Sequence, residues 1–259
     1  MKVACCQLDI VWEDKEANFS KVESMAAGAN LPSGSLFVLP EMFATGFSFN
    51  LGLTAENPGG RTEIFLAELA RKFSIYVAGG LVSFQDSKPS NQAVLFSPKG
   101  ELIYRYSKIF PFSGAGEHMH HAAGSRIPGF KLEGFQAAMF ICYDLRFPEI
   151  FRSSALNGVE LMIVIANWPV VRIQHWITLL QARAIENQAY VVGVNRAGQD
   201  PALIYPGRSI IVDPHGNIMA DARSEEGLMS ADLDVNEVQN WRRNFPAIRD
   251  IRKEFLSHP

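Results

Sequence analysis

Short runs of hydrophobic residues, rich in β-branched and aromatic side chains, alternate with stretches of helical periodicity along this 259-residue chain. The runs have the length and composition of β-strands, and about eleven strands are predicted. They cover residues 2–10, 35–40, 74–84, 92–97, 101–107, 135–142, 160–167, 189–195, 208–213, 217–222 and 227–234. The helical stretches cover residues 16–29, 62–73, 147–157, 172–187 and 235–243. This alternation predicts an α/β fold in which helices pack on sheets.

Some of the predicted strands are hydrophobic at every position, as in "LMIVIA" at 161–166. Such a strand has both faces buried, one under helices and the other against a second sheet, which predicts a layered sandwich. Turn-rich segments at 85–91 ("QDSKPSN") and 97–101 ("SPKGE") indicate hairpins rather than a domain boundary. We therefore expect residues 1–259 to form one domain, with the final ~15 residues as a C-terminal tail.

Composition and charge exclude several classes of protein. The net charge is −3, so there is no basic field to attract nucleic acid or anionic lipid. No hydrophobic run reaches the roughly 18–20 residues that span a bilayer, and Asp9 interrupts the N-terminal run too early for a signal peptide. The cysteines, Cys5, Cys6 and Cys142, lack the spacing of a disulfide framework. We expect a cytoplasmic protein that binds neither nucleic acid nor membrane.

Three predicted strands end at, or are followed directly by, a residue whose side chain can take part in a reaction: Glu41, Lys108 and Cys142. Sites in α/β folds gather at the carboxyl ends of strands. A desolvated carboxylate can act as a base, and a thiol near a base and a cation can act as a nucleophile. Each residue also has an ordinary interpretation, as a solvated glutamate, a surface lysine and an inert buried cysteine. Together they describe a base, a cation and a nucleophile, with no histidine beside the cysteine.

The segments around these residues resemble the three signature blocks of the nitrilase, or carbon–nitrogen hydrolase, superfamily. The blocks are "LPEMFATGF", "YSKIFPF" and "FICYDLRFPE", and the likeness extends through "GEHMHHAAG", "NWP" and "LLQARAIENQAYVVGVNRAG". This resemblance implies a four-layer αββα sandwich, commonly a homodimer paired through a helical face, without cofactor or metal. Within the superfamily the chain looks most like the ω-amidase branch, which hydrolyses 2-oxoglutaramate and similar monoamides of dicarboxylates.

The resemblance also implies a role for each block. Cys142 attacks the amide carbonyl to form a thioester, and Glu41 takes the thiol proton, passes it to ammonia and then activates water. Lys108 would lower the pKa of the thiol from about 8.5 and, with the backbone N–H of Tyr143, hold the oxyanion. Glu117 matches a second glutamate that orients the lysine or the substrate; the alternative is a solvated loop glutamate.

Substrate selection is expected partly in "IANWPVVRIQHW". Trp168 would supply a hydrophobic wall, and Arg172 would clamp a carboxylate unless it is a surface helix residue. The charged residues after the nucleophile, Asp144, Arg146 and Glu149, are expected to pair and to fix the turn that presents the thiol. Arg146 as a substrate anchor is the alternative.

The histidines of "EHMHH" raise the question of a metal site. His118, His120 and His121 lie close together, but no cysteine at ligand spacing accompanies them. We therefore interpret them as loop residues near the site and expect no metal. Cys5 and Cys6, on opposite faces of the first strand, are expected to fill the core.

Other functions remain open at this point. The same three residues could serve a nitrile, an N-carbamoyl amino acid or another linear amide, because the thioester chemistry is shared. A binding or scaffold protein that keeps the fold without catalysis is a further alternative. The sequence thus predicts a hydrolase of a linear carbon–nitrogen bond in a small-molecule amide, with an ω-amidase as the preferred form.

Overall fold

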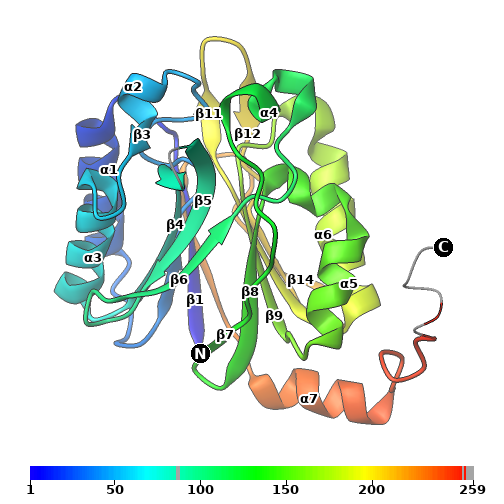
Figure 1. Ribbon diagram of the computed structural model, residues 1–259. Coiled ribbons are helices and arrows are strands. Elements are labelled where there is room, and N and C mark those ends of the chain that lie inside the picture. Colours follow the sequence, from blue (N-terminus) through cyan, green and yellow to red (C-terminus); the bar gives the residue numbers. More distant parts are fainter. Residues whose placement is uncertain (86–87, 253, 255–259) are drawn as a thin grey trace.

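The computed structural model describes residues 1–85, 88–252 and 254, which form two β-sheets packed face to face between outer layers of helices (Figure 1). Each predicted strand and each predicted helix is present. Within the described residues the first sheet has the strand order β15–β1–β2–β4–β5–β6, with β3 beside β4. Its strands are β1 (Lys2–Gln7), β2 (Leu36–Val38), β3 (Ala55–Glu56), β4 (Tyr76–Gln85), β5 (Lys88–Phe96), β6 (Leu102–Ser107) and β15 (Gly227–Asp232).

The second sheet has the order β14–β13–β10–β9–β8–β7. Its strands are β7 (Phe130–Leu132), β8 (Phe135–Ile141), β9 (Leu161–Ala166), β10 (Tyr190–Asn195), β13 (Ile210–Val212) and β14 (Ile218–Asp221). A small hairpin of β11 (Ala197–Gln199) and β12 (Ile204–Pro206) projects beyond the sheets at the top of Figure 1. The strands that the sequence did not predict, β3, β7, β11 and β12, are too short to produce a clear hydrophobic pattern.

The helices form the outer layers. Helices α1 (Lys15–Gly28) and α3 (Arg61–Phe73) flank the first sheet, and α5 (Pro148–Leu156) and α6 (Ile173–Asn187) flank the second (Figure 1). Helix α7 (Val235–Asn244) runs across the opposite end from the hairpin. Short helical turns connect the larger elements: α2 (Leu51–Thr54), α4 (Glu117–His120), η1 (Ser113–Ala115), η2 (Cys142–Arg146) and η3 (Val170–Arg172). This is the αββα arrangement that the sequence predicted.

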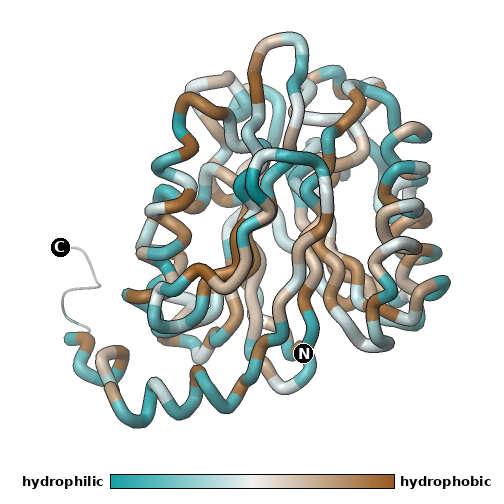
Figure 2. Tube along the Cα trace, turned by 180° about the vertical axis from the view of Figure 1, so that it is seen from behind, coloured by the Kyte–Doolittle hydropathy of each residue, from teal (hydrophilic) through white to brown (hydrophobic). Residues whose placement is uncertain are grey.

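The core consists of three hydrophobic clusters, one for each interface between layers. Strand β9 shows how one segment serves two of them. Its residues Leu161, Ile163 and Ile165 belong to the cluster between the sheets, and the alternate residues belong to the cluster under α5 and α6. This explains why the strand is hydrophobic at every position. Figure 2 shows hydrophobic strands in the middle of the molecule and a mainly hydrophilic α7 outside them.

Two boundary expectations need comment. The segment 85–91, expected to be a turn, is mostly strand: Gln85 pairs with Lys88, and Asn91 lies within β5 opposite Val82. Residues 86–87, the remaining part of that predicted turn, lie outside the described residues. The predicted C-terminal tail follows α7, and its residues 245–252 contain no helix or strand, whereas 253 and 255–259 lie outside the described residues.

The topology gathers strand ends at one edge of the molecule. Strands β8, β9 and β10 are parallel and in register, so Ile141, Ile165 and Val194 lie side by side. The residues that follow these strands therefore emerge together. The segment that follows β2 in the first sheet reaches the same region, because Glu41 is hydrogen-bonded to Asn167, the residue that follows β9.

Candidate active site

Glu41 lies two residues beyond Leu39 at the end of the β2 run, and its side chain is completely buried. The carboxylate is surrounded by donors. Oε1 accepts hydrogen bonds from Asn91 Nδ2 at 2.7 Å and Lys108 Nζ at 3.0 Å, and Oε2 accepts one from the backbone N–H of Asn167 at 2.8 Å. A buried carboxylate with these partners is held in one orientation. The interpretation of Glu41 as a solvated loop residue is therefore wrong.

A glycine in the neighbouring strand makes room for this segment. Gly80 in β4 donates its N–H to the Pro40 carbonyl at 3.1 Å and accepts the Phe43 N–H at 3.2 Å. A Cβ atom at this position would lie 2.6 Å from the Cα of Glu41 and 2.7 Å from the backbone nitrogen of Met42. Only glycine permits so close an approach of the two chains. The position of Glu41 thus depends on this glycine.

Lys108 follows β6, and its side chain is only 1% exposed. Its ammonium lies 3.0 Å from Glu41 Oε1 and 2.8 Å from Glu117 Oε2, and 5.5 Å from the centre of the Phe47 ring. Burial by itself opposes the charged form, but the carboxylate of Glu117 and then that of Glu41 raise the pKa of Lys108 above its ordinary value. The lysine therefore stays an ammonium, and it is not a surface residue.

Glu117, at the start of α4, is also completely buried. Oε2 accepts the Phe112 N–H at 2.6 Å and Lys108 Nζ at 2.8 Å, and Oε1 lies 2.8 Å from Asn91 Nδ2 and 3.4 Å from His121 Nδ1. Burial opposes ionisation, yet the pKa of Glu117 is lowered, first by the Lys108 charge and then by the hydrogen bonds from His121 and Asn91. This glutamate is a permanent anion, which excludes the alternative of a solvated loop residue.

Cys142 stands at the end of β8, where η2 begins, with a positive φ of 48°. A non-glycine residue rarely adopts this left-handed conformation, so the surrounding contacts must hold it in a sharp turn. The turn exposes part of the side chain to the pocket and places Sγ 3.9 Å from the carbonyl oxygen of Asn167. In this position Cys142 packs against the core on one side and lines the pocket on the other.

Lys108 acts to lower the pKa of Cys142, as predicted, but the pKa of the thiol is raised overall instead of lowered. Burial raises the pKa of the thiol, the adjacent Glu41 carboxylate raises it further, and the opposing effect of Lys108 is smaller. The carboxylates of Glu41 and Glu117 flank the Lys108 ammonium, and their negative charges oppose its effect on the thiol. The resting cysteine is therefore a neutral thiol that needs a base.

The turn that presents Cys142 is fixed by Asp144, which is fully buried. Its Oδ2 accepts the Ile141 N–H at 2.9 Å and the Tyr106 hydroxyl at 2.7 Å, and Oδ1 accepts the Phe110 N–H at 3.0 Å. One carboxylate thereby joins the turn after β8 to the segment after β6. Burial raises the pKa of Asp144 to about 6, even though Lys108 and these hydrogen bonds favour its ionised form.

Arg146 does not pair with Asp144, in contrast to the prediction. Its guanidinium lies over the Trp168 ring, 4.8 Å from the centre, and 3.2 Å from His175 Nδ1. Burial and then the charge of Arg172 lower its pKa below the ordinary value. The alternative interpretation, an arginine that faces the substrate, agrees with this position.

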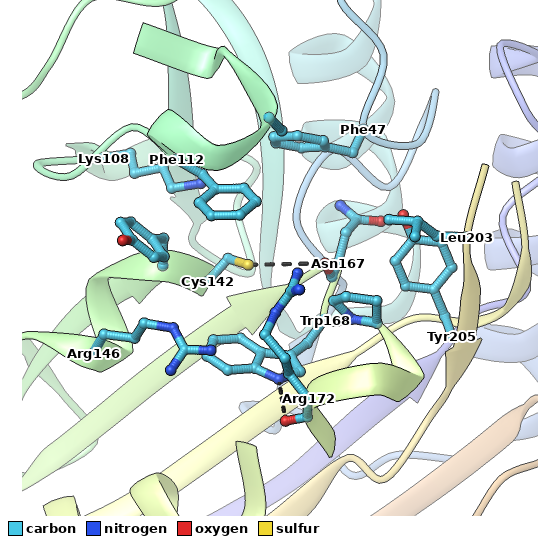
Figure 3. A pocket seen from close by; sticks show the side chains of 13 residues that line it. Phe47, Lys108, Phe112, Cys142, Arg146, Asn167, Trp168, Arg172, Leu203 and Tyr205 are labelled. Carbon is cyan, nitrogen blue, oxygen red and sulfur yellow. Dashed lines mark hydrogen bonds between the residues drawn. The ribbon is translucent and has the colours of Figure 1, made fainter. Parts of the chain in front are cut away.

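These groups surround a small pocket of about 60 Å³ (Figure 3). Both Trp168 and Arg172 line it, as predicted for residues that contact substrate. The indole Nε1 of Trp168 donates to the Arg172 carbonyl at 2.8 Å, and the Arg172 guanidinium lies 5.6 Å from the Phe112 ring centre. In Figure 3 the Arg172 side chain extends into the pocket toward Cys142. The other lining residues are Phe47, Lys108, Phe112, Ala115, Tyr143, Arg146, Asn167, Pro169, Leu203 and Tyr205.

The charge in this pocket is unbalanced. Of the residues that the structure describes, no aspartate or glutamate forms an ion pair with Arg146 or Arg172. Two guanidinium groups beside one another in a partly desolvated pocket repel, and an anion between them relieves the repulsion. The pocket thus contains two cationic side chains whose charge no carboxylate of the described residues neutralises.

The sequence did not reveal several residues of the site. Asn91 was part of the predicted turn, and Asn167 was quoted in "NWP" without a role. Phe47 and Phe112 are the last residues of the blocks "LPEMFATGF" and "YSKIFPF", but nothing in those blocks indicates that they line a pocket, and Tyr205 lies in a segment without a distinctive pattern. Asn167 could have been recognised as a polar residue that ends a hydrophobic strand, the signal that identified Glu41 and Cys142.

Neither a metal site nor a membrane-spanning helix is found in the described part of the chain. No cluster of three or more histidine, cysteine, aspartate or glutamate side chains there could hold a metal ion. His120 instead stacks on Phe49 at 4.6 Å, and His121 is buried against Glu117. None of the described helices is long and hydrophobic enough to cross a bilayer.

Comparison with known proteins identifies the family. Residues 2–243 match the Carbon-nitrogen hydrolase family. The chain belongs to this family. This carbon–nitrogen hydrolase is 34% identical over 254 residues to the 2-oxoglutaramate amidase of Bacillus subtilis (strain 168), covering 97% of this chain and 98% of the relative. It is 36% identical over 260 residues to omega-amidase YafV of Yersinia enterocolitica, covering 99% and 98% of the two chains.

A solved structure supports the same assignment. XC1258 from Xanthomonas campestris, a CN-hydrolase superfamily protein, matches this carbon–nitrogen hydrolase with a TM-score of 0.91 and 29% identity over 97% of each chain. The predictions of the superfamily, the sandwich fold and hydrolysis of a carbon–nitrogen bond are thus confirmed.

Proposed function

We propose that this carbon–nitrogen hydrolase is an ω-amidase that converts 2-oxoglutaramate-like monoamides of dicarboxylates to the acid and ammonia. The observation that carries the proposal is the pair of arginines, Arg146 and Arg172, which have no carboxylate partner among the described residues and line the pocket that also contains Cys142. An ω-monoamide has the matching form, with an amide at one end and a carboxylate at the other. The name of the Bacillus subtilis relative supports the same substrate class.

The proposed nucleophile is Cys142 and the proposed base is Glu41. The thiol sulfur attacks the amide carbonyl while its proton passes to the Glu41 carboxylate, because a thiol with a raised pKa does not ionise beforehand. The tetrahedral intermediate then collapses, the carbon–nitrogen bond breaks, and the proton moves from Glu41 to the departing nitrogen. Ammonia leaves and a thioester on Cys142 remains. Water attacks this thioester, with Glu41 again accepting the proton and then returning it to the thiolate.

Lys108 and the backbone N–H of Tyr143 are proposed to hold the negative oxygen of both tetrahedral intermediates. The ammonium of Lys108 lines the pocket and remains charged between two carboxylates. A donor that is already charged and oriented needs no reorganisation when the oxyanion forms. Glu117 is proposed to keep the lysine in position, since its four hydrogen-bond partners leave it no free lone pair for the substrate.

We also propose that the 259 residues form one domain, that the protein is a homodimer and that it is cytoplasmic. Support for one domain is the family match from residue 2 to residue 243. The free cysteines fit a reducing compartment.

Membership of a superfamily whose members commonly form dimers supports the homodimer. Light scattering during size-exclusion chromatography tests it, and the mass of a single chain would contradict it.

The catalytic proposal is tested by measuring ammonia release from 2-oxoglutaramate and from a neutral amide of equal length. The first should be hydrolysed with a higher kcat/KM, because only its carboxylate can neutralise the arginines. Cys142→Ala should remove turnover while circular dichroism remains that of the folded protein. With a slow substrate, mass spectrometry should detect an acyl group on Cys142.

The same substrate panel includes a nitrile and an N-carbamoyl amino acid. Preference for either of these over every ω-monoamide contradicts the ω-amidase assignment but retains the cysteine chemistry. Turnover that survives Cys142→Ala contradicts the mechanism itself. A folded protein that hydrolyses none of these compounds and gains no acyl group would be a non-enzymatic member of the family.

A further inference from the structure

A single buried amide joins the two carboxylates of the site. The Nδ2 of Asn91 donates to Glu41 Oε1 at 2.7 Å and to Glu117 Oε1 at 2.8 Å, and the side chain is buried. Lys108 Nζ bridges the same two carboxylates from another side, at 3.0 and 2.8 Å. The four side chains thus form a closed ring in which two anions alternate with one cation and one neutral donor.

The chemistry of the ring requires an amide at this position. An asparagine NH₂ group has two hydrogens, and here each of them goes to a different carboxylate. The Oδ1 atom of Asn91 has no hydrogen-bond partner among the described residues, so the donors alone fix the direction of the amide. Reversal of the amide would bring its oxygen against two anions. A side chain of the same shape that carries an acid could not make both bonds.

The backbone of the same residue also holds the lysine segment. The carbonyl oxygen of Asn91 accepts the N–H of Lys108 at 2.9 Å. Asn91 therefore bonds to both carboxylates and to the backbone of Lys108, yet it is not among the residues that line the pocket. Its influence on a reaction must pass through Glu41 and Lys108.

We infer that Asn91 is a positioning residue for the reaction: it holds the Glu41 carboxylate in the orientation that accepts the thiol proton and separates that carboxylate from Glu117. This inference rests on the proposed role of Glu41 as the base. Because Asn91 does not touch the substrate, its loss should lower kcat and leave KM nearly unchanged.

The decisive variant is Asn91→Asp. When protonated, the new acid can donate to only one of the two carboxylates, and once ionised it places a third negative charge against them. We expect the kcat of this variant to be at least about ten-fold below that of the wild type and its KM to be within about two-fold of the wild-type value. The loss of kcat should grow as the pH rises. Asn91→Ala removes both donors without adding charge, so its deficit should be the same at every pH.

A matched control is available in the next residue of the strand. Gln92 is equally buried, but its amide oxygen accepts from Arg105 instead of contacting the carboxylates. Gln92→Glu makes the same amide-to-acid change beside a cation and should leave kcat and its pH dependence as in the wild type. An equal loss in Gln92→Glu and Asn91→Asp would show a general effect of acids in this strand and would overturn the inference.

A second readout separates this inference from the identity of the substrate. Alkylation of Cys142 by iodoacetamide needs only the thiol and its neighbours, with Cys142→Ala as the blank. The added charge in Asn91→Asp should move the pH profile of the alkylation rate to higher pH, and Gln92→Glu should not, even if no ω-monoamide is hydrolysed.

An unchanged pH profile of alkylation, an unchanged kcat or an effect on KM alone would overturn the role of Asn91. So would loss of the fold in both Asn91 variants, because it would make the residue necessary for folding rather than for placing the carboxylates.

Discussion

Three hydrogen bonds join Glu41 to Asn167 across the interface between the two sheets, the longest of them from Asn167 Nδ2 to Glu41 Oε2 at 3.4 Å. The Asn167 N–H donates to Glu41 Oε2 at 2.8 Å, and Asn167 Nδ2 donates to the Glu41 carbonyl at 2.7 Å. Glu41 follows β2 of the first sheet and Asn167 follows β9 of the second, 126 residues later. The carbonyl of Asn167 in turn lies near the thiol of Cys142. The geometry of the site is thus a property of the packed sandwich and of neither sheet alone.

Asn167→Ala should weaken both the fold and the reaction. The substitution leaves the buried Glu41 carbonyl without its 2.7 Å donor, which should lower the free energy of unfolding by about 1–3 kcal/mol. Displacement of the carboxylate should lower kcat by about ten-fold. Urea unfolding and ammonia release measure the two effects. The control is Asn157→Ala, an exposed asparagine that bonds only to a carbonyl of its own helix, and equal stability losses in both variants would contradict the argument.

Glu41→Gln should separate turnover from thiol reactivity. Without a base, turnover should fall by about 10²–10⁴-fold. The negative charge of Glu41 raises the pKa of Cys142, so its removal should lower the thiol pKa and speed alkylation by iodoacetamide near neutral pH. Stopped-flow alkylation across the pH range measures this shift.

The control for this variant is Glu149→Gln, which removes an exposed acid from the helix that follows the same turn. It should change neither turnover nor alkylation. Slower alkylation in Glu41→Gln would mean that Glu41 activates the free thiol at rest, contrary to the charge arrangement described above.

The arginine pair should set the preference for a charged substrate. Arg146→Met and Arg172→Met each keep a long hydrophobic side chain but remove the cation, so KM for 2-oxoglutaramate should rise by about 10–100-fold. The neutral amide of equal length should be hydrolysed as before. Steady-state ammonia release on both substrates gives the ratio of kcat/KM values.

Arg61→Met on α3 serves as the control, because Arg61 is exposed and pairs with Glu16 far from the pocket. An equal loss on the charged and the neutral substrate would assign Arg146 and Arg172 to the structure of the pocket rather than to carboxylate binding.

The sequence predicted those parts of the molecule that are indicated by the pattern of residues within one short segment. Hydrophobic runs gave the long strands, and helical periodicity gave the long helices. Glu41, Lys108 and Cys142 were found because each follows such a run. Short strands such as β7 and β11 were not predicted, because two or three residues are too few to show a hydrophobic period. Only their pairing with neighbouring strands defines them.

The remaining parts of the site depend on contacts between distant segments. Asn91 belongs to a stretch with proline, serine and lysine that is typical of a turn, and only its pairing with β4 makes it a buried strand residue. The raised pKa of Cys142 could not be predicted either, since it reflects burial and the two glutamates around Lys108. The sequence shows which charged residues are present, but the net shift of a pKa also depends on the distances between their charges.

Asp144 should give the folded protein a distinctive pH dependence. Its pKa is raised to about 6 by burial, whereas an aspartate in an unfolded chain has a pKa of about 3.9. Between these values the folded protein binds the proton more tightly than the unfolded chain, so the contribution of Asp144 to stability falls as the pH rises from about 4 to about 6. Asp144→Asn cannot titrate. The stability advantage of the wild type over this variant should therefore shrink by about 2–3 kcal/mol over that range.

Urea unfolding at a series of pH values measures this difference, and Asp221→Asn supplies a control of opposite sign. Asp221 is partly buried, but the guanidinium of Arg208 holds its pKa below the ordinary value, so its contribution is lost as the pH falls. The advantage of the wild type over Asp221→Asn should thus grow as the pH rises, while that over Asp144→Asn shrinks. A constant difference between the wild type and Asp144→Asn would mean that Asp144 ionises in the folded protein as it does in the unfolded chain. The three hydrogen bonds to its carboxylate would then offset the cost of burial.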